Sequence, residues 1–416
     1  MGQTAFLSMK ILLLPYYYYI QYESFRLIAG ELLNRGMDVC MLHIPNMSPK
    51  DEAQAYNPKR FKKDGVPFAR FSLYRFAVGA GVFRPFLQIV QFYWNARRLK
   101  RLILKLNPDA LVIGSHLGGV YIRFVARLCY ELSIPLVSMW VTKDILRDSV
   151  SIPRWVPLPK ASRSIIEWKA SNVYIQDQLL VVPGSVIKNH LVSLGVKEEQ
   201  IVVTGNPAHD TMYSCLNKEE HSSTGSKVTT GTRYIVYVSQ PLHELFSIDY
   251  LREYLGSLGN AFDKLPPDIR VLVKFHPREI EEIKRIHRQE LCSSRYDFIE
   301  EADLAMLMSR AELSVGHHSR ALEISLMVGT PVLCACFSAD ENYFFYGEGN
   351  RALQCLAPRE FDDKLSAFFS DGTFRQSAKL AMEEWLEDNA SPKDGKNTSR
   401  VVDAIVAHIN GPRRAR

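Results

Sequence analysis

The sequence predicts an α/β protein with two domains, each built on a doubly wound parallel sheet. Short apolar runs alternate with amphipathic helical patterns along the chain, as in sheets whose parallel strands are buried on both faces. The 416 residues, 47% of them hydrophobic, suffice for two separate cores. Residues 217–232, rich in Ser, Thr, Gly and charge, interrupt the alternation and are typical of a linker between domains.

The first alternating series predicts an N-terminal domain over residues 1–216. Met9–Pro15 is a continuous apolar run, as expected of a buried strand, and the helical pattern of Tyr22–Arg35 that follows it ends at Gly36. The other segments of this domain show the same two patterns. Strands are predicted at Met37–Ile44, Ala110–Gly114, Pro135–Val141, Gln178–Val182 and Ile201–Thr204, and helices at Leu87–Leu106, Val120–Leu132 and Ser185–Leu194.

The second series predicts a C-terminal domain over residues 233–398. Helical patterns separate its apolar runs, so its sheet is also expected to be parallel. A last helix, near Arg400–Ile409 in the segment 399–416, can pack back across the domain boundary. Strands of this domain are predicted at Arg233–Val238, Val271–Phe275, Leu313–Val315 and Pro331–Cys334.

Cysteine usage and hydropathy favour a protein of a reducing compartment. The seven cysteines are an odd number and form no C-x-x-C pair, so neither a disulfide framework nor a structural zinc site is predicted. The longest apolar region, 110–141, is interrupted by Arg123, Arg127 and Glu131, which argues against a membrane span. The N-terminus shows no signal-peptide pattern. We therefore expect a cytoplasmic location, at the inner face of the membrane if the basic segment described next binds lipid.

The formal net charge of +6 hides an asymmetry along the chain. Residues 59–105 contain 12 Lys or Arg, a single acidic residue, Asp64, and ten aromatic residues. Interleaved cationic and aromatic side chains suit an anionic membrane surface that carries a lipid-linked glycan. A helical region with core aromatics and solvated charges explains the same composition. A nucleic-acid groove would share it too, but no nucleic-acid motif accompanies it, so no nucleic-acid partner is expected.

Ligands of open parallel sheets bind beyond the carboxyl ends of the strands, so residues that follow strands are the candidates for a site. In the second domain, His276, Pro277 and Arg278 follow a strand. The two basic side chains there can neutralise a phosphate, and the proline fixes the turn that presents them. Gln240 follows another strand of the same domain, in a polar loop.

A glycine turn and a helix follow a third strand, over residues 316–328. Ser319 is a natural N-cap, and the amides and dipole of the helix N-terminus, flanked by His318 and Arg320, make an anion site. Glu323, one turn further, can reach a ribose hydroxyl. No third ligand accompanies the adjacent histidines at a suitable spacing, so no metal is predicted.

Three segments resemble the GT-B superfamily of nucleotide-sugar enzymes, and the resemblance covers nearly the whole chain. They lie at 179–210, 316–333 and 394–405, and they look like the branch of UDP-N-acetylglucosamine 2-epimerases and CDP-glycerol glycerophosphotransferases. The pair His276-Pro277 resembles the H-P motif of bacterial sialyltransferases and Kdo transferases. The resemblance implies two Rossmann-like domains that face a cleft, with the nucleotide on the C-terminal domain.

The chain departs from the epimerases at their N-terminal motifs. Where those enzymes carry G-T-R-P-E after the first strand, this chain has Pro15-Tyr16-Tyr17. Where they carry H-V-E-A-G-L-R, it has 140–144, WVTKD. The resemblance therefore favours a transferase over an epimerase.

The resemblance also implies roles for the candidate residues of the second domain. His276 and Arg278 would contact the donor phosphate, Ser319 with the amides after it would hold that phosphate, and Glu323 would take the ribose. In the first domain, Gly205 permits a tight turn after a strand, and Asn206 would line the cleft with it. A bare turn at the strand exit explains the last two residues equally well.

An inverting transferase needs a base within hydrogen-bond reach of the acceptor hydroxyl. By the same resemblance the base comes from the N-terminal domain, where Asp144 ranks first and His116 and Glu23 follow. No metal and no cofactor are expected, because a helix dipole and cationic side chains can stabilise the leaving phosphate and the nucleotide sugar is itself a substrate.

The sequence thus predicts a metal-independent GT-B glycosyltransferase that moves a sugar from a nucleotide-sugar donor to a cell-surface polysaccharide or a lipid-linked glycan. A CMP-sugar is slightly favoured as the donor, and a UDP-sugar remains open. One alternative is an epimerase or hydrolase like UDP-N-acetylglucosamine 2-epimerase. Another is a non-catalytic binding protein of the same fold.

Overall fold

The computed structural model describes residues 9–15, 19–43, 65–71, 84–114, 120–139, 178–193, 195–216, 232–242, 246–277, 279–317, 319–337, 354–390 and 394–411. The chain forms two compact units, one of residues 1–210 with 391–416 and one of residues 211–390. The predicted linker 217–232 lies outside the described residues except for Thr232, so that boundary stays a prediction. The last residues of the chain return to the first unit.

The strands of the first unit are β1 (Lys10–Leu14), β2 (Asp38–His43), β3 (Phe68–Arg70), β4 (Ala110–Ile113), β5 (Leu136–Met139), β6 (Leu179–Val182) and β7 (Ile201–Val203). They form one parallel sheet in the order β3-β2-β1-β4-β5-β6-β7. The strands predicted from apolar runs are confirmed. β3 was not predicted, because three residues at a sheet edge carry too little periodic signal.

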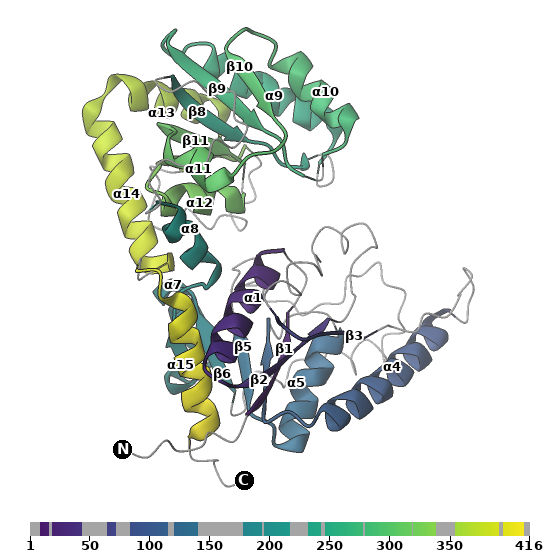
Figure 1. Cartoon of the computed structure of the whole chain (residues 1–416). Coiled ribbons are helices and arrows are strands. Elements are labelled where there is room, and N and C mark those ends of the chain that lie inside the picture. Colours follow the sequence, from purple (N-terminus) through teal and green to yellow (C-terminus); the bar gives the residue numbers. More distant parts are fainter. Residues whose placement is uncertain are drawn as a thin grey trace. The chain divides into compact units, whose positions relative to one another are not determined.

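The described helices of the first unit are α1 (Tyr19–Asn34), α4 (Arg84–Leu106), α5 (Val120–Leu132), α7 (Ser185–Ser193), α8 (Ala208–Leu216), which crosses into the second unit, and α15 (Asn397–Asn410). They cover both faces of the sheet (Figure 1). Ile11 and Leu13 of β1 pack in one core with α1 and α15, whereas Leu12 and Leu14 pack in another with α4 and α5. Burial on both faces is the reason that β1 is apolar throughout instead of alternating with polar residues.

The strands of the second unit are β8 (Arg233–Val238), β9 (Ile269–Lys274), β10 (Tyr296–Ile299), β11 (Leu313–Gly316), β12 (Val332–Ala335) and β13 (Gln354–Cys355). They form a parallel sheet in the order β10-β9-β8-β11-β12-β13. Its described helices are α9 (Ile248–Phe262), α10 (Glu281–Glu290), α11 (Leu304–Ser309), α12 (Arg320–Met327), α13 (Pro358–Ser370) and α14 (Gly372–Ala390). One core lies against α9, α10 and α13, and the other against α11, α12 and α14.

Both sheets contain the strand order 3-2-1-4-5-6 that defines a doubly wound, Rossmann-like fold. The predicted fold class is therefore confirmed. In each sheet the winding reverses where the first strand of the unit meets the fourth, at β1 and β4 in one unit and at β8 and β11 in the other. The carboxyl ends of the strands beside such a reversal are where ligands bind in this fold.

Candidate functional site

The strongest candidate site lies on the second unit, at the carboxyl ends of β9, β8 and β11, which are neighbours in the sheet. His276 follows β9, Ser239 and Gln240 follow β8, and Ser319 follows β11. Because neighbouring strands are about 4.8 Å apart, the ends of β9 and β11 are separated by roughly 10 Å. The structure thus brings together predicted residues from three segments that are far apart in the sequence.

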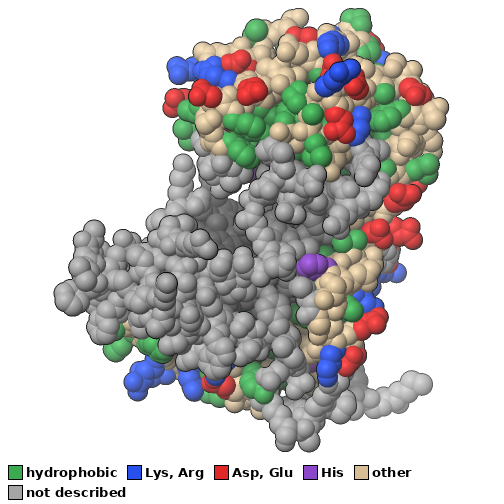
Figure 2. Space-filling view, turned by 180° about the vertical axis from the view of Figure 1, so that it is seen from behind, with side chains coloured by type: hydrophobic (Ala, Val, Ile, Leu, Met, Phe, Trp, Pro, Cys, Tyr) green, Lys and Arg blue, Asp and Glu red, His purple; other side chains and the backbone are tan. Residues whose placement is uncertain are grey.

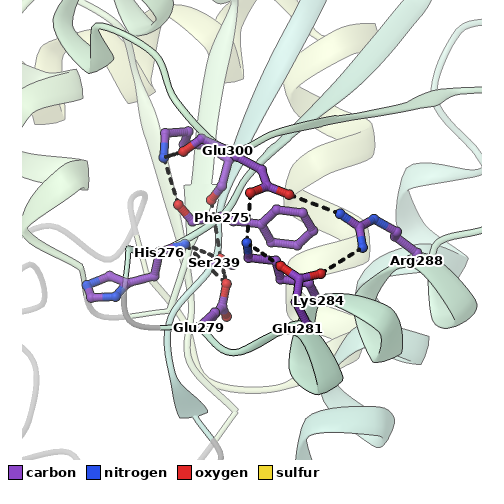
Figure 3. A network of polar contacts seen from close by, with 9 residues as sticks. Ser239, Phe275, His276, Glu279, Glu281, Lys284, Arg288 and Glu300 are labelled. Atoms are coloured by element: carbon purple, nitrogen blue, oxygen red, sulfur yellow. Dashed lines mark hydrogen bonds and ion pairs between the residues drawn. The ribbon is translucent and has the colours of Figure 1, made fainter.

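A hydrogen-bond network fixes the backbone at His276 (Figure 3). The His276 N–H donates to Ser239 Oγ at 2.9 Å and to Glu279 Oε2 at 3.1 Å. The Ser239 hydroxyl in turn donates to Glu279 Oε2 at 2.5 Å. The network ties the loop after β8 to the loop after β9, and the His276 ring points away from the Glu279 carboxylate. Backbone restraint of this kind fixes where the His276 side chain leaves the loop.

The Lys and Arg side chains beside this loop form ion pairs with glutamates. Lys284 Nζ lies 2.8 Å from both Glu281 Oε1 and Glu300 Oε2, and Arg288 Nη2 lies 3.3 Å from Glu300 Oε1. The hydrogen bond with Glu281 raises the pKa of Lys284, and the hydrogen bond with Lys284 lowers the pKa of Glu300. The Arg288 guanidinium also lies 5.3 Å from the centre of the Phe275 ring. These side chains therefore stabilise the loop, and His276 is the described basic residue that points away from them (Figure 3).

The start of α12 forms the second part of the site. Ser319 is its N-cap, as predicted, and its Oγ accepts a hydrogen bond from the Ala321 N–H at 3.3 Å. Glu323 lies in the first turn and is half-buried. A Cβ at Gly316 would lie 2.7 Å from Val238 Cγ2, so the close approach of β11 to β8 requires glycine there. The N-terminus of α12 thus starts directly at the edge of the sheet.

Beneath this turn lies a buried pair of a histidine and a cysteine. Cys336 Sγ is 2.9 Å from His317 Nε2, and Cys334 Sγ donates to the His317 carbonyl oxygen at 2.9 Å. His317 is 2% exposed and its ring contacts Tyr254 and Phe246. Burial raises the pKa of the Cys334 thiol well above its usual value. These contacts make His317 a core residue that supports the turn.

Several predicted site residues lie outside the described residues: His116, Asp144, Arg278 and His318, together with the side chain of Arg320. The base prediction can therefore be examined only at Glu23, on α1. Both Glu23 carboxylate oxygens accept from Arg26, at 2.6 and 3.1 Å. Pro277 is exposed beside His276, and Gln240 is half-buried beside Ser239.

Gly205 and Asn206 hold the C-terminal helix on the first unit. Gly205 has φ +79°, and a Cβ there would lie 2.0 Å from Asn397 Oδ1. Asn206 is 3% exposed, its Oδ1 accepts from the Ser24 hydroxyl, and its carbonyl accepts from Asn397 Nδ2. Asp210 then accepts from the Asn397 N–H at 3.0 Å and caps α15. These contacts give the two residues a structural role, and a role in a cleft stays a prediction.

The described part of the basic segment forms β3 and α4, and one face of α4 is exposed. Tyr93 and Trp94 are 56% and 57% exposed, and Val90 and Leu104 lie on the same side of the helix. Four basic residues are exposed along this face: Arg97, Lys100, Arg101 and Lys105. The opposite face packs in the core through Leu99 and Ile103, while Phe71 is also buried. The predicted segment therefore contains both core aromatics and an exposed aromatic and basic face.

The second unit shows a different charge pattern. On the side seen in the upper part of Figure 2, basic and acidic side chains lie next to each other instead of gathering by sign. Arg233 pairs with Asp268 at 2.6 Å and also with Glu312, and Arg270 pairs with Asp297 at 2.6 Å. Within the described ranges, no group of three His, Cys, Asp or Glu side chains could hold a metal ion, and no helix is long and apolar enough to cross a membrane.

Two site residues were missed by sequence reasoning, Ser239 and Glu279. Both stand in segments that the sequence singles out, next to Gln240 and directly after Arg278. A glutamate in a loop is ordinarily taken as solvated, yet Glu279 is 5% exposed. The amphipathic pattern of α10, which buries Ile283 and Ile286, was a weak signal that the chain packs against the core there.

No protein-family model matches the chain, and no curated protein matches it. Solved structures match it over 96–98% of its length. A UDP-N-acetylglucosamine 2-epimerase is 13% identical with a TM-score of 0.63, covering 96% of each chain. The UDP-GlcNAc 2-epimerase from Neisseria meningitidis bound to UDP-GlcNAc is 12% identical with a TM-score of 0.63, covering 96% of this chain and 100% of the other. The glycotransferase of kitacinnamycin is 14% identical with a TM-score of 0.57, covering 96% and 98%.

These matches and the two doubly wound sheets define the class: the chain has the GT-B fold along its whole length. Most of these matching structures are UDP-N-acetylglucosamine 2-epimerases, and one is a glycosyltransferase. At identities of 12–14% the likeness is one of fold. The predicted two-domain GT-B-like fold is thereby confirmed.

Proposed function

We propose that this protein is an enzyme that binds a nucleoside-diphosphate sugar, first of all a UDP-sugar, on its second unit and breaks the bond between the sugar and the β-phosphate. The observation that carries the proposal is the cluster of His276, Ser239 and Ser319 at three adjacent strand ends of a GT-B fold. The sequence slightly favoured a CMP-sugar. The solved relatives shift the preference to UDP, because their names include UDP-GlcNAc and UDP.

Each described residue of the cluster has a chemical part in this proposal. The N-terminus of α12 would face the β-phosphate, where a helix dipole contributes about 0.3–1 kcal/mol, and more when partly buried. His276 would donate a hydrogen bond to the diphosphate, and Glu323 would accept from a ribose hydroxyl. Charge that develops on the leaving diphosphate is thereby stabilised without a metal ion.

The first candidate activity is that of a sugar-nucleotide 2-epimerase or hydrolase, and solved relatives named above are UDP-GlcNAc 2-epimerases. Such an enzyme needs no acceptor. It converts UDP-GlcNAc to its C2 epimer, or releases UDP and free sugar, from the donor alone. The sequence departures at 15–17 and 140–144 argue against this candidate, whereas the fold of the solved relatives argues for it.

The second candidate is a glycosyltransferase, and the exposed face of α4 favours it. Exposed Tyr93 and Trp94 beside four cations suit the interface of an anionic bilayer, where a lipid-linked glycan acceptor resides. A transferase of this kind would work at the inner face of the membrane. The acceptor would bind to the first unit, and Asp144, His116 and Glu23 stay the proposed bases.

The experiment incubates the full chain with UDP-GlcNAc and with CMP-, CDP-, UDP- and GDP-sugars, with and without a lipid-linked glycan, and follows products by proton and phosphorus NMR. A C2 epimer or free sugar without acceptor identifies the first candidate, and product that requires acceptor identifies the second. Binding of a nucleotide sugar without turnover leaves a binding protein. Absence of binding to every nucleotide sugar contradicts the proposal.

His276→Ala tests the site itself. We expect at least a tenfold loss of UDP affinity or turnover, because a hydrogen bond to a charged phosphate contributes about 1.5–3 kcal/mol. His190→Ala on α7, another half-buried histidine, is the matched control and should leave UDP binding unchanged. Equal behaviour of the two variants would exclude His276 from the site.

A further inference from the structure

Three partly exposed aromatic side chains stand at the ligand-binding edge of the second sheet. Phe246 lies in the loop after β8, Tyr250 in the first turn of α9, and Phe337 two residues after β12. The strands β8 and β12 flank β11 in the sheet, so the segments that follow their carboxyl ends are close neighbours. The chemistry proposed for the diphosphate uses none of these three rings.

Ring contacts join these side chains into one cluster, called here the aromatic platform, which consists of Phe246, Tyr250, Tyr254, His317 and Phe337. The centre of the Phe246 ring lies 4.5 Å from that of Tyr250 and 5.9 Å from that of His317. The centre of the Tyr254 ring lies 5.7 Å from that of His317 and 5.3 Å from that of Phe337. Tyr254 and His317 are each 2% exposed, so the platform has a buried base below its three partly exposed rings.

We propose that the aromatic platform binds the pyranose ring of the nucleotide sugar. This inference rests on the proposed function for the nucleotide and adds the place where the sugar binds. A pyranose has an apolar face of C–H groups that packs on the flat face of an aromatic ring, and small-molecule sites are lined predominantly by apolar and aromatic side chains. The three partly exposed rings carry no positive charge, so they suit the uncharged part of the ligand and not its phosphates.

The layers of the unit determine which end of the ligand reaches the platform. The helix α12, which carries the proposed ribose residue Glu323, packs on the face of the sheet that α11 and α14 also cover. The platform belongs to the opposite face, which α9, α10 and α13 cover. A diphosphate held at the strand ends between these faces directs the ribose to one face and the sugar to the other. A nucleobase on the platform would require the reverse orientation.

The rings of the platform are held in place before any ligand binds. The Tyr250 N–H donates to Ser247 Oγ, the N-cap of α9, at 3.1 Å, which fixes the turn that carries this ring. The centre of the Phe337 ring lies 6.1 Å from that of Phe361, which is fully buried in the same core. Side chains that are already ordered lose little conformational freedom when a ligand packs on them, so more of the contact energy contributes to affinity.

Substitutions separate binding of the sugar from support of the fold. Phe246→Ala and Phe337→Ala should each weaken binding of UDP-GlcNAc roughly threefold to tenfold, which corresponds to the loss of one ring contact, and should leave UDP affinity within about twofold. Phe246→Tyr keeps a ring and should restore the affinity that Phe246→Ala loses. Phe369→Ala is the matched control, because Phe369 is a partly buried phenylalanine that packs against the same core. It lies near the end of α13, which starts after the carboxyl end of β13 and runs back toward the opposite edge of the sheet.

The test measures the affinities of UDP and UDP-GlcNAc for these full-length proteins by calorimetry. Proton NMR of bound UDP-GlcNAc is recorded as well, because an aromatic ring shifts the signals of C–H groups above its face upfield. Upfield shifts of the pyranose protons, with a loss of affinity for UDP-GlcNAc but not for UDP in the two alanine variants, support the platform. Unshifted pyranose protons, equal losses for both ligands, or the same loss in Phe369→Ala would overturn it.

A second probe distinguishes this inference from the proposed function. The methyl glycoside of N-acetylglucosamine, which carries no nucleotide, is added at millimolar concentration, and its contacts are detected by saturation-transfer NMR. If no UDP binds but the pyranose protons receive saturation from the wild type and not from Phe246→Ala, the proposed function fails and the platform stands. If UDP binds while the alanine variants keep full affinity for UDP-GlcNAc, the platform fails and the proposed function stands. If neither probe binds, both fail.

Discussion

At the scale of single residues, Gly205 shows how one turn combines a backbone and a packing requirement. Its φ of +79° lies in the left-handed region, and its α-carbon faces the fully buried Asn397. Either requirement alone would favour glycine. Together they predict that a substitution of Gly205 lowers the free energy of unfolding more than a substitution of a glycine that is required only by its backbone conformation.

Gly205→Ala should lower the free energy of unfolding by roughly 2–5 kcal/mol, since left-handed alanine costs about 1–2 kcal/mol and overpacking adds about 1–3. Gly195→Ala is the matched control, because Gly195 has φ +87° and a Cβ there would meet nothing within 4 Å. We expect that variant to lose only the backbone cost of about 1–2 kcal/mol. Urea unfolding of both variants measures the difference, and equal losses would show that Asn397 moves aside without cost.

The residue scale also shows where sequence reasoning stops. The positions of His276 and Ser319 follow from apolar runs that end in a turn, and both stand where a parallel sheet binds ligands. The role of Glu279 does not follow from any pattern. Its burial depends on Ser239 and His287, which are 40 residues before it and eight after it, and only the folded loop shows that the three meet.

At the scale of elements, α4 joins a core face and an exposed face along 23 residues. Sequence alone predicted a helix at 87–106 and left two explanations of its composition open. The structure shows that Leu99 and Ile103 pack in the core and that Tyr93 and Trp94 are exposed, and the membrane contact stays a prediction. The strands β3, β10 and β13 were not predicted, and β3 and β13 have only three and two residues, which are too few to show a period.

The exposed face of α4 should bind anionic vesicles. We expect the chain to sediment with phosphatidylserine-containing vesicles at low salt and to be released largely at high salt, because each Lys or Arg near the surface contributes about 1 kcal/mol that salt screens. Tyr93→Ala with Trp94→Ala should reduce binding at both salt concentrations, since it removes the apolar part. Lys379→Gln with Leu380→Ala, on the exposed side of α14, is the control. Absence of binding at low salt would refute the membrane contact, and equal binding to single-stranded DNA would indicate a general polyanion surface.

At the scale of the whole molecule, the chain is divided unequally between its two units. The second unit is one continuous segment, 211–390, whereas the first needs the C-terminal residues 391–416. The helix α15 places Val401, Val402 and Ile405 in the same core as β1 and α1. The sequence predicted this helix and its return to an earlier domain, but its cap by Asp210 required the structure.

Removal of α15 should therefore unfold the first unit and spare the second. Burial of three aliphatic side chains contributes roughly 5–8 kcal/mol, which is comparable with the entire stability of a typical domain. A chain that ends at Ala390 should lose one of two unfolding transitions in calorimetry and should still bind UDP, if the site lies on the second unit as proposed. A chain that ends at Asn410 keeps all of α15 and should retain both transitions. Loss of both transitions in the shorter chain would mean that the second unit depends on the first for its fold. Loss of UDP binding while the transition of the second unit is retained would mean that the first unit contributes residues to the nucleotide site.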